Sequence, residues 1–314
     1  MTFEASRAKV GALVAPRNVV IVGASDRPGN WALRAWRNLQ RYNFPGRIFL
    51  INPRRDEILG EKCYPDFAAL PEPPDHILVV TPAPAVPDVL EQGAAAGARS
   101  ATVFSSGFGE AYDEAGAALG KRLREVIART GLGVSGPNCM GNVCKPAGFV
   151  TLTEDRPQNM SAGEVALVGQ SGGVMIFVNQ ALEERGMFAR YLITSGNEAG
   201  LQVADYIAFF ASESELKVII VYVEAVADLG RFVEACKLAR AAGKSVIAIK
   251  LGQSEEGRKA ALAHTGSLAG TVAAFDAVAA DAGVIRADTL DDAVELAELL
   301  AHTGAPSGCR LGAV

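Results

Sequence analysis

Short runs of β-branched and other apolar residues alternate along this chain with longer, alanine-rich stretches of helical period. This alternation is typical of a parallel β-sheet with helices on both faces. In the first half, five such runs predict strands over Asn18–Val22, Arg47–Ile51, His76–Val80, Ser100–Phe104 and Leu132–Val134. In the second half, five further strands are predicted to begin at Val165, Arg190, Lys217, Ser245 and Val284. The pattern predicts an α/β protein with two consecutive doubly wound parallel sheets.

The stretch Gly136–Gly163 lies between the two sets of strands, is rich in Pro, Asn and Gly, and has no clear period. Such a composition is typical of a connection between domains. We therefore expect a first domain at residues 1–145 and a second at residues 146–304. Residues 305–314 end in a strand-like run without a helix after it, so we expect the start of a further domain or a truncated tail.

Composition narrows the class of protein. A chain of 314 residues, of which 49% are hydrophobic, can bury a large core. Its longest apolar runs, such as Val218–Val223, fall far short of the about 20 residues that span a bilayer, and no export signal is visible. Five scattered cysteines favour a reducing, cytoplasmic setting, and Cys139 with Cys144 is too isolated a pair to indicate a metal site. A net charge of −5 argues against nucleic-acid binding.

A glycine turn follows the first predicted strand. It begins with Gly23-Ala24-Ser25 and precedes a helical run from Trp31, and such a turn offers backbone N–H groups to a phosphate. The spacing departs from the dinucleotide fingerprint, and the second strand is followed by Pro53, Arg54 and Arg55 instead of an acidic residue. Two arginines there would attract a phosphate on a ribose. These residues favour coenzyme A (CoA) or NADP over NAD.

Two more segments follow predicted strands on the carboxyl edge of the first sheet, where open α/β sheets bind ligands. The segment after the third strand contains Thr81, Pro82 and Ala83. The segment after the fourth strand contains Ser105, Ser106 and Gly107. Each segment alone is more simply explained as a turn. Together with the glycine turn and the arginines, the segments indicate a cofactor groove.

The second half repeats the arrangement of strand, glycine turn and helix. Its turn is Gly169-Gln170-Ser171-Gly172-Gly173, before a helical run from Val174. We expect Gln170, Ser171, Gly172 and Gly173 to form a second anion site. The glycines could equally serve only to let the helix pack closely on the strand, and the turn alone does not decide between these interpretations.

Two further residues of the second half suit phosphoryl transfer. Glu224 ends the third strand of this half, and His264 lies on the connection after the next strand, in the small and polar run Ala263–Gly270. If Glu224 accepts a hydrogen bond from one ring nitrogen, the other nitrogen is free to attack, so we expect a transient phosphohistidine. Taken singly, Glu224 is more simply a solvated strand end and His264 an exposed loop residue.

Four motifs, in this order along the chain, resemble those of the ADP-forming (NDP-forming) acyl-CoA synthetases, relatives of the succinyl-CoA synthetase α subunit. They are Gly136-Pro137-Asn138-Cys139-Met140-Gly141, Gly169-Gln170-Ser171-Gly172-Gly173, Ser195-Gly196-Asn197-Glu198 and His264-Thr265-Gly266-Ser267-Leu268-Ala269-Gly270. The similarity extends from about Asn18 to the C-terminus. It implies a Rossmann-like CoA-binding domain followed by a flavodoxin-like ligase domain.

The resemblance also implies roles for the candidate residues. His264 would be phosphorylated, Glu224 would support it, and the helix start at Ser171–Gly173 would hold the phosphate. The residues implied to lie near CoA are Gly23, Ala24 and Ser25, then Arg54 or Arg55, and Thr81, Pro82 and Ala83.

The reaction implied by the resemblance converts a carboxylic acid, CoA and ATP reversibly to acyl-CoA, ADP and phosphate. The phosphoryl group would pass through an acyl phosphate and His264 to a nucleotide that an ATP-grasp module binds with Mg²⁺. No such module is visible in these residues, so we expect an ATP-grasp domain or subunit as partner, in a homo- or hetero-oligomer. The small carboxylic acid stays unidentified.

Two other functions stay open on the sequence alone. One is an NADP-dependent oxidoreductase, which the arginines after the second strand favour but which lacks the glycine fingerprint and an obvious hydride-transfer site. The other is a non-catalytic CoA-binding regulatory module whose second half is an interaction domain.

Overall fold

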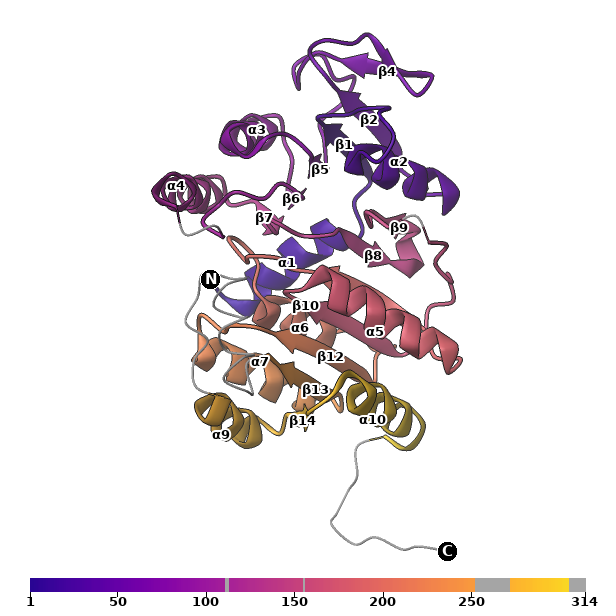
Figure 1. The fold of residues 1–314 in the computed structure, drawn as a ribbon, viewed down its shortest axis with the longest axis vertical. Coiled ribbons are helices and arrows are strands. Elements are labelled where there is room, and N and C mark those ends of the chain that lie inside the picture. The colour runs from indigo at the N-terminus through magenta and orange to yellow at the C-terminus, as the bar shows by residue number, and fades with distance from the viewer. Residues whose placement is uncertain (111–112, 155, 252–271, 305–314) are drawn as a thin grey trace, which may run out of the picture.

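The computed structural model describes residues 1–110, 113–154, 156–251 and 272–304. Its two seven-stranded sheets lie one above the other in Figure 1, each with helices packed on its faces. Both sheets are mainly parallel, and every residue of their central strands is buried: β1 (Asn18–Val22), β10 (Val165–Gly169) and β12 (Val218–Val223). The fold is therefore the two-sheet α/β architecture that the alternating pattern predicts.

The first sheet has the strand order β3-β4-β2-β1-β5-β6-β7, and only β3 runs antiparallel to its neighbour. Counted along the chain, its parallel strands follow the order 3-2-1-4-5-6 of dinucleotide-binding domains, so the direction of winding switches between β1 and β5. The other strands are β2 (Arg47–Ile51), β3 (Glu57–Ile58), β4 (Glu61–Tyr64), β5 (His76–Val79), β6 (Ser100–Val103) and β7 (Gly133–Ser135).

Polar caps decide where two helices of the first half begin. The side chain of Asn30 accepts a hydrogen bond from the N–H of Ala32 at 2.8 Å, and Asp113 accepts one from Gly116 at 2.6 Å. Gly131, in the left-handed conformation, ends the second of them. The helices of this half are α2 (Trp31–Arg41), the short 3₁₀ helix η1 (Ala83–Ala85), α3 (Val86–Ala95) and α4 (Glu114–Thr130).

The second sheet has the strand order β14-β13-β12-β10-β11-β8-β9. Its parallel strands, counted along the chain, follow the flavodoxin-like order 2-1-3-4-5, so the winding switches between β10 and β12. The other strands are β8 (Asn142–Cys144), β9 (Phe149–Val150), β11 (Ala189–Thr194), β13 (Ser245–Lys250) and β14 (Ile285–Ala287). The helices are η2 (Lys145–Ala147), α5 (Gly172–Glu184), α6 (Val203–Ala211), α7 (Leu229–Ala241), α9 (Val272–Ala282) and α10 (Leu290–Thr303).

The ten strands that the sequence predicts are confirmed, and each begins within one residue of its expected start. The sequence did not predict four short strands, β3, β4, β8 and β9, nor the first helix, α1 (Phe3–Val14). β8 pairs antiparallel with β11 in the second sheet, although it precedes residue 145. The division of the chain at residue 145 stays a prediction, and it would separate β8 from the sheet in which it pairs.

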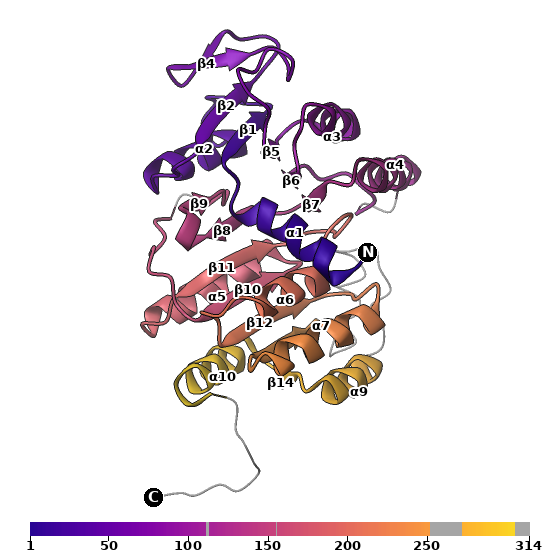
Figure 2. The ribbon, with the colours of Figure 1, turned by 180° about the vertical axis from the view of Figure 1, so that it is seen from behind.

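The helix α1 lies between the two sheets, as Figure 2 shows from behind, and packs against α6 of the second half. A buried ion pair fixes it there. Arg231 of α7 donates to Asp205 Oδ1 at 2.5 Å and to Ser6 Oγ at 2.7 Å, while Ser6 Oγ donates to Asp205 Oδ1 at 2.7 Å. The guanidinium also lies 4.3 Å from the centre of the Phe3 ring. The N-terminal helix is thereby tied to the second sheet.

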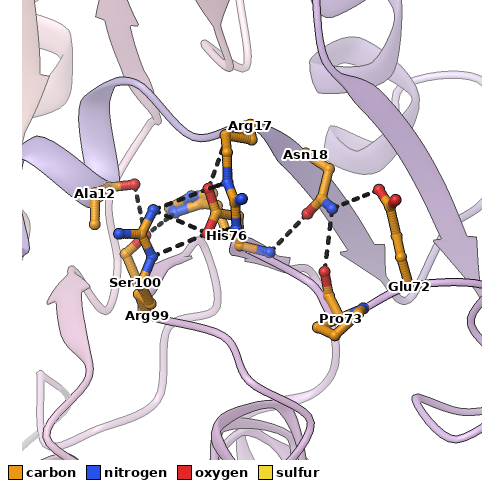
Figure 3. A network of polar contacts seen from close by, with 9 residues as sticks. Ala12, Arg17, Asn18, Glu72, Pro73, His76, Arg99 and Ser100 are labelled. Atoms are coloured by element: carbon orange, nitrogen blue, oxygen red, sulfur yellow. Dashed lines mark hydrogen bonds and ion pairs between the residues drawn. The ribbon is translucent and has the colours of Figure 1, made fainter.

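A polar network closes the amino end of the first sheet (Figure 3). Arg99 donates from Nε and a terminal nitrogen to the buried Asp75 carboxylate at 2.9 and 3.0 Å, and the N–H of Arg17 donates to it at 2.8 Å. Asn18 accepts from the N–H of Asp75 at 2.6 Å and donates to Glu72 at 2.7 Å. Burial opposes ionisation of Asp75, but these hydrogen bonds and the arginine charges lower its pKa to about 2. The network joins the starts of β1, β5 and β6 at the edge opposite the carboxyl ends of the strands.

Candidate functional site

The second glycine turn lies where the winding of the second sheet switches direction. β10 ends at Gly169, the N–H of Gln170 donates to the carbonyl of Tyr222 at 3.2 Å, and α5 begins at Gly172. A Cβ on Gly169 would lie 2.8 Å from Met175 Cγ and 2.9 Å from Tyr222 Cβ. The turn therefore holds α5 tightly against β10 and β12, so the packing explanation of these glycines is correct for Gly169.

The N-terminus of α5 is open at the same place. Among the described residues, the side chain of Ser171, the N-cap, caps no N–H group of the helix. A Cβ on Gly172 would lie 2.6 Å from Met140 Cγ, whereas one on Gly173 would meet nothing within 4 Å. Gly172 is thus needed for packing and Gly173 borders open space. Uncapped N–H groups and the positive end of the helix dipole favour an anion here.

The side chain of Gln170 connects this turn to the tip of β12. Gln170 Oε1 accepts hydrogen bonds from the N–H groups of Glu224 at 2.7 Å and Ala225 at 3.0 Å. Gln170 Nε2 donates to the carbonyl of Ala225 at 2.7 Å. Lys250, at the end of β13, donates to the carbonyl of Glu224 at 2.6 Å. The backbone that carries Glu224 is therefore held from both neighbouring strands, and Glu224 is buried, with 3% of its surface exposed.

A second carboxylate, Glu198, reaches the same place from the loop after β11. Its Oε1 accepts from Ser195 Oγ at 2.8 Å and from the N–H of Val203 at 3.0 Å. Burial raises the pKa of Glu198 to about 7, and the charge of Asp205 adds to this effect. Carboxyls with such shifts are concentrated at functional sites.

These groups surround a cavity of about 300 Å³. All five described residues that the sequence assigns to the phosphate and its support line it: Gln170, Ser171, Gly172, Gly173 and Glu224. The residues that sequence reasoning missed are Asn138, Met140, Gly196, Asn197, Glu198, Gln202, Ala225 and Ala227. Most of the missed residues belong to two motifs, Gly136–Gly141 and Ser195–Glu198, that carried the family resemblance but received no role. His264 lies outside the described residues.

The two motifs lie side by side. The N–H of Gly136 donates to the carbonyl of Ser195 at 3.1 Å, and the N–H of Asn197 donates to the carbonyl of Pro137 at 2.9 Å. Thr194 Oγ1 accepts from the N–H of Met140 at 2.8 Å and donates to the carbonyl of Gly141 at 2.7 Å. The connection between the halves is thus a fixed wall of the cavity.

A second cavity, also of about 300 Å³, lies at the carboxyl edge of the first sheet. Its lining includes Gly23, Ala24, Ser25, Arg54 and Arg55 of the predicted cofactor residues, together with Asp26, Arg27, Asn52 and Ile58. Pro53 is not among the described residues that line it. The glycine turn and the arginines are therefore brought together, as the sequence indicates.

The hydrogen bonds of this turn differ from the expectation of free donors. The N–H groups of Gly23 and Ala24 both donate to the carbonyl of Ile51, at 3.1 and 3.3 Å. Ser25 Oγ accepts from the N–H of Arg27 at 3.2 Å, and Arg55 pairs with Asp26 at 2.9 Å. The expectation that Gly23 and Ala24 offer free N–H groups is therefore wrong, because the turn uses them to hold itself against β2.

The remaining predicted cofactor residues form the neighbouring wall. Ser105 Oγ donates to the carbonyl of Thr81 at 2.5 Å, so the loops after β5 and β6 are joined. A Cβ on Gly107 would lie 3.4 Å from Ala83 Cβ, which places these two segments in contact. The N–H of Gly107 already donates to Glu110 Oε2 at 2.9 Å. Pro82, the N-cap of η1, and the exposed Ser106 lie on the same two loops.

Two classes of site receive no support from the described part of the chain. Residues 1–110, 113–154, 156–251 and 272–304 contain no group of three or more His, Cys, Asp or Glu side chains that could hold a metal ion. Within those same ranges, no helix combines the length and apolarity needed to cross a bilayer.

Both halves match known protein families. Residues 17–145 match the CoA binding domain, and residues 162–300 match the succinyl-CoA ligase like flavodoxin domain. The two matches agree with the strand orders of the two sheets.

Three relatives span nearly the whole chain. The α subunit of ADP-forming acetate–CoA ligase I from Pyrococcus furiosus is 35% identical over 95% of this chain and 64% of its own length. A trans-feruloyl-CoA synthase from an unknown prokaryote is 34% identical over 98% of this chain and 44% of its own length. ADP-forming acetate–CoA ligase I from Archaeoglobus fulgidus is 35% identical over 91% of this chain and 41% of its own length.

A solved structure shows the same arrangement of both sheets. The dinucleotide-forming acetyl-coenzyme A synthetase 1 of Ca. Korarchaeum cryptofilum, in complex with phosphate and ADP, superposes with a TM-score of 0.87. It is 30% identical and is matched over 95% of this chain and 64% of its own chain. This chain spans less than two thirds of the length of these relatives. With its two matched domains, the chain belongs to the ADP-forming acyl-CoA synthetase family and represents the α-subunit-like portion of it.

Proposed function

We propose that this chain is the CoA-binding and phosphoryl-relay portion of an ADP-forming acyl-CoA synthetase. The reaction of the whole enzyme is the reversible conversion of a small carboxylic acid, CoA and ATP to acyl-CoA, ADP and phosphate. In the direction that starts from acyl-CoA, phosphate displaces the thiol of CoA to give an acyl phosphate. His264 then attacks phosphorus, the bond from phosphorus to the carboxylate oxygen breaks, and the acid leaves.

One observation carries this proposal: the N-terminus of α5, which the side chain of its N-cap Ser171 does not cap in the described part of the chain, and Glu224 border one cavity at the switch point of the second sheet. The helix end suits the phosphate, and the carboxylate suits a histidine that must become a cation as it is phosphorylated. A ring nitrogen that donates to Glu224 leaves the other nitrogen free for attack. Splitting the transfer into two steps lets distant sites share one phosphoryl group.

The cavity on the first sheet is the proposed CoA site. Its arginines, Arg54 and Arg55, supply positive charge at the end of β2, where the ribose of a dinucleotide would lie. CoA carries a phosphate on its ribose, so these side chains suit it better than they suit NAD. The walls formed by the loops after β5 and β6 would then lie along the rest of CoA.

A partner completes the enzyme in this proposal. An ATP-grasp module, on the same polypeptide or on another subunit, binds ATP or ADP with Mg²⁺ and exchanges the phosphoryl group with His264. Two curated relatives are named α subunits, which supports a separate partner subunit. The relatives are named for acetate, trans-ferulate and 4-hydroxybutyrate, so a panel of carboxylic acids assayed for CoA thioester formation identifies the substrate.

Labelling the complete enzyme with [γ-³²P]ATP tests the relay. We expect an acid-labile, base-stable protein label that is absent from His264→Ala and present in the matched control His302→Ala, whose side chain is exposed on α10. A label that persists in His264→Ala would exclude His264 as the carrier. An enzyme that acquires no label and makes no thioester, yet binds CoA, would favour a regulatory module.

Calorimetric titration with CoA, dephospho-CoA and NADPH tests the cofactor. We expect CoA to bind more tightly than dephospho-CoA, and Arg54→Ala with Arg55→Ala to remove roughly a tenfold preference, which is the size of one charged hydrogen bond. Arg122→Ala, which breaks an exposed pair with Asp88, is the control. Tight NADPH binding without CoA binding would favour the oxidoreductase instead.

A further inference from the structure

We propose that Gln170 acts on Glu224 and not on the phosphate: it is the positioning residue that fixes the tip of β12. This inference rests on the proposed function, because it assigns how the phosphohistidine site of that function is built. It also replaces the phosphate-binding role that the glycine turn suggested for Gln170.

Most of the hydrogen-bonding capacity of Gln170 is used at the tip of β12. An amide side chain has two acceptor positions on its oxygen and two N–H donors. The N–H groups of Glu224 and Ala225 occupy the oxygen, at 2.7 and 3.0 Å. The nitrogen donates to the carbonyl of Ala225 at 2.7 Å. The backbone N–H of Gln170 donates to the carbonyl of Tyr222 at 3.2 Å, so three of the four side-chain positions and the backbone donor are directed at β12 and its tip.

The pattern of these bonds explains why the residue is glutamine. The two backbone N–H groups at the tip of β12 need an acceptor, while the Ala225 carbonyl needs a donor. A glutamate would offer no donor and a lysine no acceptor. The amide of Gln170 satisfies both kinds of group from the end of β10.

The consequence is a fixed position for the β12 tip. Glu224 follows directly after Val223, the last residue of β12, and its backbone is held by Gln170 on one side and Lys250 on the other. A carboxylate on such a tip has little freedom to move away from a histidine that it must orient. Small displacements of a catalytic group reduce the rate strongly while substrate binding elsewhere is retained.

Steady-state kinetics of the complete enzyme, from acyl-CoA and varied inorganic phosphate, test this role. We expect Gln170→Met, which keeps the shape and removes the three side-chain bonds to the tip of β12, to lower kcat about 100-fold, with KM for phosphate changed less than about threefold. Ser171→Ala, at the phosphate end of α5, is the comparison and should raise that KM. Gln92→Met, at an exposed position of α3, is the matched control and should change neither.

A binding measurement, which does not depend on catalytic turnover, completes the test. Calorimetric titration of the chain with inorganic phosphate should give the same affinity for wild type and Gln170→Met. If Gln170→Met does not fold, Gln170→Glu, which keeps the acceptor and loses both donors, answers the same question. A raised phosphate KM with an unchanged kcat, or lost phosphate affinity, would overturn the positioning role. A wild-type enzyme that acquires no phosphoryl label would overturn the proposed function instead.

Discussion

Ser195 Oγ donates a hydrogen bond of 2.8 Å to Oε1 of Glu198, which lines the same cavity as Glu224. This bond and the one from Val203 favour the ionised carboxylate, yet burial outweighs them and raises the pKa of Glu198 to about 7. The cavity therefore contains a carboxyl that changes charge near neutral pH beside the proposed phosphate site.

Glu198→Gln should alter how stability depends on pH. The pKa of Glu198 is about 7 in the folded chain and its ordinary value is 4.5, so the folded state holds the proton more tightly. This contribution is fully present below about pH 4.5 and is lost as the pH rises to about 7, amounting to at most about 3 kcal/mol. Urea unfolding at pH 5 and pH 8 measures it. We expect a smaller difference between the two pH values in the variant, and an equal difference would contradict the assignment.

The same variant should change phosphate binding. Above pH 7 an ionised Glu198 adds negative charge to the cavity and opposes the binding of an anion. We expect Glu198→Gln to bind inorganic phosphate more tightly than wild type at pH 8, by roughly threefold to tenfold for a partly screened charge. Calorimetry at pH 6 and pH 8 gives the comparison. The prediction fails if the gain is as large at pH 6 as at pH 8.

Gly172→Ala and Gly173→Ala should have opposite effects. At Gly172 the new methyl group would lie 2.6 Å from Met140, so we expect a loss of about 1 to 3 kcal/mol of stability. At Gly173 it would meet nothing within 4 Å, and alanine is the better helix former by about 1 kcal/mol. Gly173→Ala should therefore keep or raise the melting temperature while weakening phosphate binding. Equal destabilisation by both changes would contradict this arrangement.

Asp75→Asn tests the network at the opposite edge. The pKa of the Asp75 carboxyl is about 2, below its ordinary value of 3.8. Its ionisation therefore stabilises the fold above about pH 4, and this contribution is lost as the pH falls through about 2. We expect the variant to lose about 3 kcal/mol at pH 7, because the arginines lose a buried partner. Asp288→Asn, at an exposed position, is the control for urea unfolding. A loss that stays equally large at pH 2 would contradict the role of ionisation.

Gly23→Ala tests the turn at the proposed CoA site. Gly23 and Gly29 both have positive φ, 86° and 80°, so alanine is strained by roughly 1 kcal/mol at either position. Only at Gly23 would the Cβ also approach the carbonyl oxygen of Val80, at 2.7 Å. We expect Gly23→Ala to lose stability and CoA affinity together and Gly29→Ala to lose about 1 kcal/mol of stability alone. Similar melting temperatures and CoA affinities would contradict the prediction.

The sequence predicted the central parallel strands because they are apolar runs buried on both faces, as in β1, β10 and β12. The short strands β3 and β9, of two residues each, are too short to show a period, and β8 is held by pairing with β11 that is distant in the chain. The helix α1 was missed because its buried face includes Ser6, whose polarity is compensated by Asp205 and Arg231. Tertiary contacts decide these elements.

The sequence predicted most of the residues that its motifs place at the candidate site, but it did not predict the hydrogen bonds between them. Strand ends and glycine turns locate Ser171, Gly173 and Glu224 at one edge, and the structure brings them to one cavity. The sequence could not show that the side-chain amide of Gln170 forms hydrogen bonds with the tip of β12. Those bonds depend on β10 and β12 being neighbours in the sheet. Glu198 was missed because its motif lies after β11 with no pattern to distinguish a half-buried carboxyl from a solvated one.

The antiparallel edge formed by β8 and β9 has a practical consequence for anyone who wishes to produce the halves separately. A fragment that stops at residue 145 would take β8 away from its sheet and leave the flank of β11 bare, while the fragment that remains would lack the helix on which α6 rests. Exposed strand flanks of this kind promote aggregation. Expression of the intact pair is therefore the safer route to soluble material.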